Sequence, residues 1–330
     1  MMHKFFLYLH RNQIMLALFL IVCGWFIFEL RGIIVSIFLS YIIMAALLPF
    51  VEYLQAKKFN KILSVFIPYI FILIAIFLLV IPLVPFFAEQ IHSLFTGFPQ
   101  YLNKSANVIG FQLDPRQLQA YFASFANSLS QNALSFTGKI FGSVFTTVTV
   151  IVVSFYLLMY SEDFKQWFAS MFQESDRTRV RLTMQRVNDK LGAWLRGQVL
   201  LSFFIGLMSW IGLMLIGMPF ALPLALIAGL LEVVPTLGPI LSAIPAVIVA
   251  LTISPTLALG VVVLYILIQL TENHVIVPKL MQKAVGLNPV VVILGIMIGA
   301  NLMGIPGALL SIPFISFMMV LFESIEKPTE

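Results

Sequence analysis

The sequence predicts an all-α polytopic membrane protein with about eight membrane segments. Of its 330 residues, 61% are hydrophobic and only 10% are charged, whereas soluble domains average roughly 45–50% apolar and about 25% charged residues. Apolar runs such as residues 70–81 do not alternate with polar residues, as the strands of a membrane barrel would. This composition excludes a soluble enzyme, a DNA-binding domain, a disordered chain and a disulfide scaffold.

Long stretches without Asp, Glu, Lys or Arg predict the individual spans. They are residues 12–28, 32–51, 62–88, 140–161, 197–231, 233–271 and 284–322. Because a membrane helix needs about 20 mostly apolar residues, each of the first four predicts one span. No small-residue cleavage site follows the first stretch, so we interpret it as an uncleaved span rather than a signal peptide. The last three stretches are 35, 39 and 39 residues long, which is too long for one helix each.

The positions of Lys and Arg predict the orientation, because these residues are enriched in cytoplasmic loops. With the N-terminus inside, 15 of them fall on the cytoplasmic side and 4 fall outside. We therefore predict that both termini are cytoplasmic (N-in/C-in). Alternation of the spans then requires residues 218–255 to start and end outside, and residues 284–322 to start and end inside. Each must be a hairpin, either re-entrant or made of two short full spans.

These assignments divide the chain into six parts. They are N-terminal transmembrane helices 1–3 (1–87), an extracytoplasmic amphipathic helical segment (88–139), transmembrane helix 4 (140–160), cytoplasmic amphipathic helices (161–196), a C-terminal transport unit (197–322) and a cytoplasmic tail (323–330). The outer helix after Asp114 either packs as a surface helix or serves as a gate or binding lid. The basic cytoplasmic helix suits an anionic inner leaflet or a neighbouring subunit, or merely anchors the next span.

The first hairpin contains the sequence 229-GLLEVVPTLGPILSAIP-245, in which prolines and glycines break a helix between two apolar arms. Broken backbone at membrane depth is tolerated only where protein or a water-filled cavity covers it. Glu232 lies about one turn before the break. An ionisable residue in such a run is a functional candidate by default, and a carboxyl can exchange a coupling proton. The alternative is a structural Glu232 that caps the broken helix or pairs with a cation such as Arg196.

The second hairpin contains 299-GANLMGIPGALLSIP-313, which glycines and Pro306 break. Paired Gly/Pro-interrupted segments of opposite orientation point to a transport site at the membrane midplane, so we expect the two tips to meet inside the bilayer. The candidate solute or ion pathway consists of Glu232, Pro235, Thr236, Gly238, Pro239, Asn301, Gly304, Pro306 and Gly307.

Residues toward the cytoplasmic side of the C-terminal unit are candidates for gating and coupling. They are Arg196, Gln198, Glu272, Asn273, Pro278, Asn288 and Pro289. We expect an apolar helix to end at Glu272, Pro278 to interrupt it, and Asn288-Pro289 to start the next arm. The alternative for residues 271–292 is an ordinary cytoplasmic loop.

Known catalytic patterns are missing from the sequence. It contains no G-x-S-x-G, no H-E-x-x-H and no phosphate-binding G-x-x-x-x-G-K-[ST], and its four Asp residues lie outside the apolar runs. The four histidines lack the spacing of metal ligands, and the net charge of +5 is dispersed along the chain. We therefore expect no enzyme, no catalytic residue, no metal, no cofactor and no nucleic-acid partner.

Residues 229–251, 272–289 and 299–313 resemble the AI-2E (autoinducer-2 exporter) family of bacterial membrane transporters, the PerM-like permeases. The order of spans, long outer segment and cytoplasmic helix also fits this family. The resemblance implies export of a solute or signal, Na⁺(Li⁺)/H⁺ antiport in some members, and a homo-oligomer whose expected form is a pentamer.

Together these observations predict a secondary transporter in the inner membrane of a bacterial cell. It would export a small polar solute or autoinducer-2-like signal, with H⁺ or Na⁺ as the coupling ion. The alternatives are a Na⁺(Li⁺)/H⁺ antiporter and, from another class, a non-transporting membrane scaffold. We expect residues 197–322 to move against the N-terminal spans, with Gly192 and Gly197 as hinges.

Overall fold

The computed structural model describes residues 28–74, 133–233, 237–251, 253–281 and 288–326, with a few residues between 17 and 26. All regular elements in these ranges are helices, and the ranges contain no strand, so the predicted all-α fold class is confirmed. The amphipathic helix expected in the outer segment and most of the first predicted span lie outside the described residues.

Four of the described helices are long and apolar enough to cross a membrane. They are Arg31–Ala56, Arg177–Leu215, Pro255–Leu280 and Ile305–Ser324, and a fifth candidate is a pair bent by 74° near Tyr160. Large hydrophobic side chains stay exposed along these helices, such as Leu215 at 77% and Ile305 at 73%. Such surfaces are stable in lipid but not in water. The chain is therefore a multi-pass membrane protein, while the count of eight segments and the N-in/C-in orientation stay predictions.

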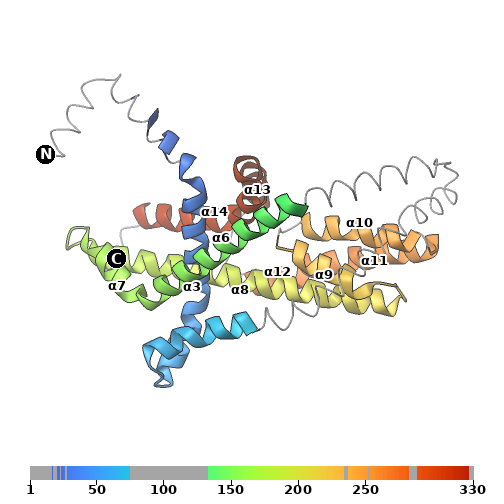
Figure 1. Cartoon of the computed structure of the whole chain (residues 1–330), viewed down its shortest axis with the longest axis horizontal. Coiled ribbons are helices and arrows are strands. Elements are labelled where there is room, and N and C mark those ends of the chain that lie inside the picture. The colour runs from blue at the N-terminus through green and yellow to red at the C-terminus, as the bar shows by residue number, and fades with distance from the viewer. Residues whose placement is uncertain are drawn as a thin grey trace.

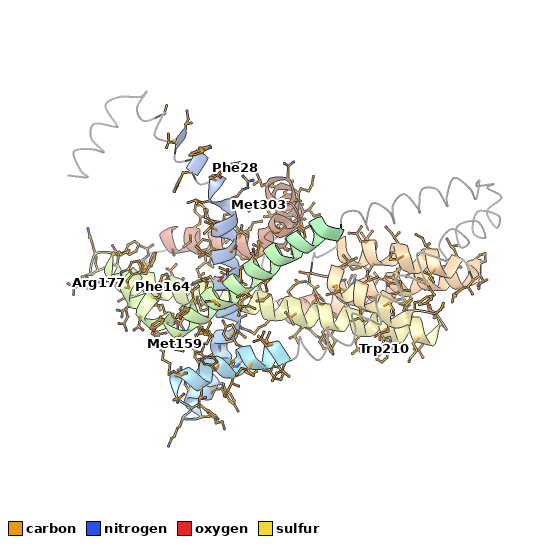
Figure 2. The ribbon with its side chains drawn as sticks, viewed as in Figure 1. Phe28, Met159, Phe164, Arg177, Trp210 and Met303 are labelled. Carbon is orange, nitrogen blue, oxygen red and sulfur yellow. The ribbon has the colours of Figure 1, made fainter. Side chains whose placement is uncertain are left out.

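Helix α8 (Arg177–Leu215) is the axis of the described structure (Figure 1). Its 39 residues correspond to a length of about 58 Å. Helix α3 (Arg31–Ala56) crosses its first half and packs on α6 (Ala133–Met159), whereas α9 (Ala221–Leu231) and α11 (Pro255–Thr271) lie against its second half. In Figure 2, Arg177 and Trp210 mark opposite ends of this long helix.

A single helix thus runs through residues 192–197, where we expected hinges between a cytoplasmic helix and a span. Gly192 does not loosen α8, because it is the point of closest approach to α3. A Cβ at position 192 would lie 2.3 Å from the Ala45 carbonyl oxygen. One turn earlier on both helices, the Tyr41 hydroxyl donates a hydrogen bond to the Asn188 side-chain oxygen. The amphipathic face of residues 188–196 therefore packs against the middle of a predicted span.

Both C-terminal stretches fold as pairs of helices. Helix α9 is followed after a short break by α10 (Leu237–Leu251), and α13 (Pro289–Met303) is followed by α14 (Ile305–Glu326). The second pair turns at Gly304, whose φ of +65° favours glycine. The expected start at Asn288-Pro289 is confirmed, since the Asn288 side chain accepts a hydrogen bond from the Val290 N–H.

The regular α-helix ends at Thr271, next to Glu272 as expected, but the predicted interruption at Pro278 is wrong because the chain stays helical there. Helix α11 continues through a π-helical turn (Glu272–Ile276) into α12 (Val277–Met281). Pro278 has no N–H to donate, and its position early in α12, directly after the wider π turn, accommodates the lost hydrogen bond. Such π turns inside helices are frequent at functional sites.

The second hairpin depends on close backbone contact at Gly307. A Cβ there would lie 2.0 Å from the Gly299 carbonyl oxygen. We expect Gly307→Ala to lower the stability of the protein by about 1–3 kcal/mol, because overpacking forces the two helices apart. Thermal unfolding in detergent should show this loss. Gly260→Ala is the matched control, since nothing lies within 4 Å of its added Cβ, and an equal loss in both variants would contradict the explanation.

Candidate functional site

Glu232 follows the last residue of α9, at the break of the first hairpin. Its side chain is 0% exposed, and neither carboxylate oxygen receives a hydrogen bond from the described residues. No described Lys, Arg or His forms an ion pair with it. A buried carboxylate without a cation or donor is costly. The site therefore calls for a partner that is not a side chain of the described part of the protein.

A second buried carboxyl group faces Glu232. Glu272, which begins the π turn, is 2% exposed, and its charge acts on the carboxyl group of Glu232. The only hydrogen bond to the Glu272 carboxylate in the described residues comes from the Gln269 amide, at 3.3 Å. Two carboxylates that share a buried site repel each other unless a proton or a metal cation lies between them.

Gln198 holds the backbone at the break. Its Nε2 donates a hydrogen bond of 2.7 Å to the Glu232 carbonyl oxygen, which is one of the orphan carbonyls at the end of α9. The Gln198 Oε1 atom is buried without a hydrogen-bond donor among the described residues. Gln198 of α8, Glu232 at the end of α9 and Glu272 of the π turn thus lie together. The sequence analysis had identified all three as pathway or coupling residues.

Gly238 brings the two arms of the first hairpin together. A Cβ at this position would lie 2.5 Å from the Leu231 carbonyl oxygen and 2.7 Å from the Glu232 Cα. Helix α10 can therefore begin directly against the end of α9. Gly238 and Pro239 are buried beside the acidic pair, whereas Pro235 and Thr236 lie outside the described residues.

Arg196 does not neutralise Glu232, which was the structural alternative considered for the sequence. Its Nη1 donates instead to the carbonyl oxygens of Ala46 at 2.9 Å and Ala45 at 3.3 Å on α3. Pro49 explains this contact, because a proline four residues later leaves the Ala45 carbonyl without its helical N–H partner. Arg196 is therefore a structural residue of the α3–α8 crossing.

Replacing Arg196 with Met should consequently destabilise the protein without removing ion coupling. The loss of hydrogen bonds from a charged group predicts a cost of about 1.5–3 kcal/mol. Thermal unfolding in detergent would measure this cost, and the ratio of proton to solute flux in liposomes should stay unchanged. A variant of normal stability that has lost coupling would place Arg196 in the ion pathway instead.

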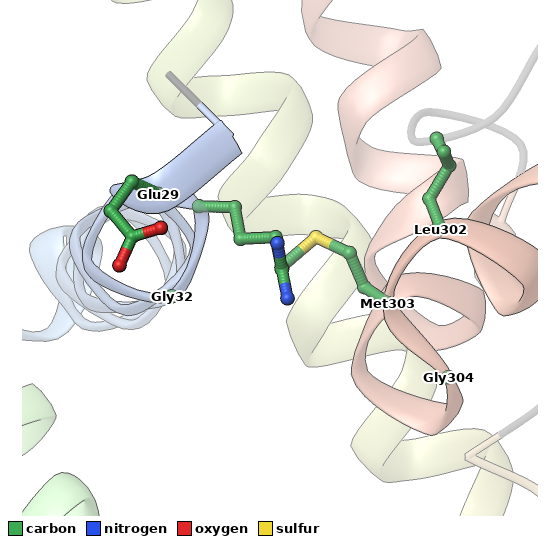
Figure 3. Close-up of a pocket in the computed structure, with 6 residues that line it drawn as sticks. Glu29, Gly32, Leu302, Met303 and Gly304 are labelled. Atoms are coloured by element: carbon green, nitrogen blue, oxygen red, sulfur yellow. The ribbon is translucent and has the colours of Figure 1, made fainter. Parts of the chain in front are cut away.

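The tip of the second hairpin has other neighbours. Leu302, Met303 and Gly304 face Glu29, Arg31 and Gly32 across an open pocket of about 540 Å³ (Figure 3). The tip thus lies beside the start of α3, while Glu232 packs against α8 and the π turn. Residues 234–236 at the tip of the first hairpin lie outside the described residues, so the meeting of the two tips stays a prediction. Asn301, Pro306, Asn273 and Pro278 are exposed, and Gly307 is buried in the hairpin.

Four residues near the acidic pair were missed by the sequence reasoning. Ser202, Ser209, Ser242 and Tyr265 place buried hydroxyl groups between the helices of this bundle. Each lies inside a long charge-free stretch. The sequence analysis searched these stretches only for charged residues and Gly/Pro breaks, so it did not select them. For Ser202, Ser209 and Tyr265, the helical spacing from Gln198 or Glu272 was the signal that could have identified them, whereas no such signal marks Ser242.

Comparison with known proteins identifies the family of the chain. The sequence profile of the family described as 'AI-2E family transporter' matches residues 14–327. YrrI of Bacillus subtilis is 28% identical over 88% of this chain and 84% of its own length. The AI-2 transport protein TqsA of Escherichia coli is 27% identical over 93% of this chain and 89% of its own length. A sodium-lithium/proton antiporter of Halobacillus andaensis is 24% identical, with 92% and 93% covered. The chain therefore belongs to the AI-2E transporter family.

Proposed function

We propose that this AI-2E family member is a secondary transporter of the bacterial inner membrane, which exports a small polar solute coupled to a cation gradient. The observation that carries the proposal is the buried Glu232–Glu272 pair without a cationic side chain among the described residues. A bound H⁺ or Na⁺ would neutralise the pair, and its release would recharge it. Binding and release can thus favour two different arrangements of the surrounding helices.

The position of the pair supports coupling rather than simple structural stability. Glu232 lies at the break between α9 and α10, and Glu272 begins a π turn, so both carboxyls sit where regular helix geometry is interrupted. Interrupted helices expose backbone carbonyls that can contact an ion or a solute. An acidic pair that served stability alone would need a cation or several donors.

A Na⁺(Li⁺)/H⁺ antiporter is the second candidate function, and the same pair favours it. Two carboxylates can hold either a proton or a hard monovalent cation, which is the competition that an antiporter requires. The similarity to the Halobacillus andaensis protein, whose name states this activity, points the same way. In this case the pair would be the transport site itself, and no organic solute would be needed.

Flux measurements on the full chain in liposomes test both candidates. Vesicles loaded with labelled autoinducer-2 are given a pH gradient or a Na⁺ gradient, and solute release, Na⁺ uptake and internal pH are followed. We expect one gradient to accelerate solute release. Coupled Na⁺ and H⁺ movement that ignores the solute would favour the antiporter. The absence of any gradient-dependent flux would favour the scaffold and overturn the proposal.

A further inference from the structure

Several buried polar atoms in the bundle of α8–α11 have no hydrogen-bond partner in the described residues. They are both carboxylate oxygens of Glu232, Oε1 of Gln198, the hydroxyls of Ser202 and Ser209 on α8, and the hydroxyl of Tyr265 on α11. Most buried polar atoms in proteins are paired, and an unpaired one usually indicates a bound water or ion. Such a concentration in one bundle is therefore a property that needs an explanation.

These polar groups lie in a row along the bundle, which we call the file, and the row leads away from the acidic pair. On α8, Gln198, Ser202 and Ser209 share one face, because four and eleven residues correspond to about one and three turns. Ser202 lies against α9, since a Cβ on Gly229 would be 2.9 Å from its carbonyl oxygen. Position 229 is about one turn from Glu232, so Ser202 follows the acidic pair along the bundle.

The far end of the file lies at Tyr265. This residue is seven positions before Glu272, which places it on the same face of α11 at a distance of about 10 Å. Its hydroxyl is adjacent to Ser242 of α10, whose own hydroxyl donates to the Pro239 carbonyl oxygen. The contact between Gly212 and Leu264 places the Ser209 region of α8 beside the same part of α11.

We propose that this file of hydroxyl groups holds a chain of water molecules that conducts protons between the Glu232–Glu272 pair and the Tyr265 level of the bundle. The inference rests on the proposed function and adds the route by which the acidic pair exchanges its proton. One proton enters the chain at one end and another leaves at the other end. Each water and hydroxyl accepts one proton and donates one, so no group is consumed.

The geometry requires water rather than direct contact between the side chains. The levels of Glu272 and Tyr265 are about 10 Å apart, whereas an O–H···O hydrogen bond spans only about 2.5–3.0 Å. A buried water needs two to four polar partners, and the unpaired atoms of the file supply them. Without water, Gln198 Oε1 and the hydroxyls of Ser202 and Ser209 would have no partner among the described residues.

Removal of single hydroxyl groups tests the route. We expect Tyr265→Phe and Ser209→Ala to slow proton movement roughly tenfold in liposomes that report internal pH, because each removes one relay group. The matched control is Tyr69→Phe, which removes a buried hydroxyl that is hydrogen-bonded to Ser154 away from the file. Its proton rate should equal that of the wild-type protein.

A second measurement does not depend on transport. The sequence contains one cysteine, Cys23, so a Cys23→Ser background allows single cysteines to be introduced. In that background, Ser209→Cys should react with a small, water-soluble methanethiosulfonate reagent, because a hydrated thiol ionises there. Ser154→Cys, which replaces an equally buried serine, should stay unmodified.

The outcomes separate the file from the function that it serves. Normal proton rates in Tyr265→Phe and Ser209→Ala, together with an unreactive Ser209→Cys, would overturn the water chain. If Glu232→Gln stops transport in the same experiment, the role of the acidic pair in coupling is supported and only the proposed proton route is wrong. If Glu232→Gln also transports normally, the proposed function itself fails.

Discussion

Replacing Glu232 with Gln is expected to reduce gradient-driven flux by about a hundredfold or more, which is the usual scale for loss of a proton-transferring group. The amide has nearly the shape of the carboxyl group but can neither release a proton nor provide a negative charge. The protein should remain folded, because a neutral amide is easier to bury than an unpaired carboxylate. Its thermal unfolding temperature in detergent should therefore equal or exceed that of the wild-type protein.

Glu52→Gln is the control for this experiment, since it makes the same chemical change at an exposed position. Its flux should not change. Because the charge of Glu272 acts on the carboxyl group of Glu232, the double variant should be little worse than either single variant, as expected for groups that act as a unit. Equal flux in Glu232→Gln and wild-type liposomes would remove the acidic pair from the mechanism.

Substituting Gly238 with Ala should also abolish most of the transport activity, although residue 238 has no functional group. The added Cβ would collide with the backbone of Leu231 and Glu232, and backbone atoms cannot move aside as a flexible side chain can. The collision would displace the Glu232 carboxyl from Glu272 and weaken the contact with Gln198. We expect flux to fall at least tenfold, with a loss of about 1–3 kcal/mol in stability.

The comparison with Gly260→Ala separates displacement from a general effect of losing a glycine, because the Cβ at 260 meets open space. Flux is measured at a temperature well below unfolding, so that only folded protein contributes. A Gly238→Ala variant that is destabilised but transports at the wild-type rate would show that the position of Glu232 is not critical.

The sequence predicted the helices far better than the way they pack. Charge-free stretches and Gly/Pro breaks identified both hairpins, because burial in lipid and backbone satisfaction impose those patterns directly. The continuity of α8 through residue 197 could not be predicted in this way. A change from charged to apolar composition resembles a boundary, but nothing in it interrupts the hydrogen bonds of a helix.

The site was predicted in part. Glu232, Gln198 and Glu272 stood out as polar residues at the ends of apolar runs, and the structure brings them together. Arg196 stood out for the same reason, yet it binds α3, because the orphan carbonyl created by Pro49 lies 151 residues away in the chain. Contacts over such separations depend on tertiary packing, which local patterns do not contain.

Because α8 is continuous, the directions in which Arg196 and Gln198 point differ by a fixed angle around the helix axis. Arg196 contacts α3, and Gln198 contacts the Glu232 carbonyl. Residues that are two positions apart in a helix point in directions that differ by about 200° around its axis. Deletion of a single residue between them would rotate one contact by about 100° away from its partner, even if every side chain were retained. The transporter is therefore more sensitive to the length of this helix than to most of its composition. A shift of α3 would therefore reach the acidic pair through the continuous helix α8.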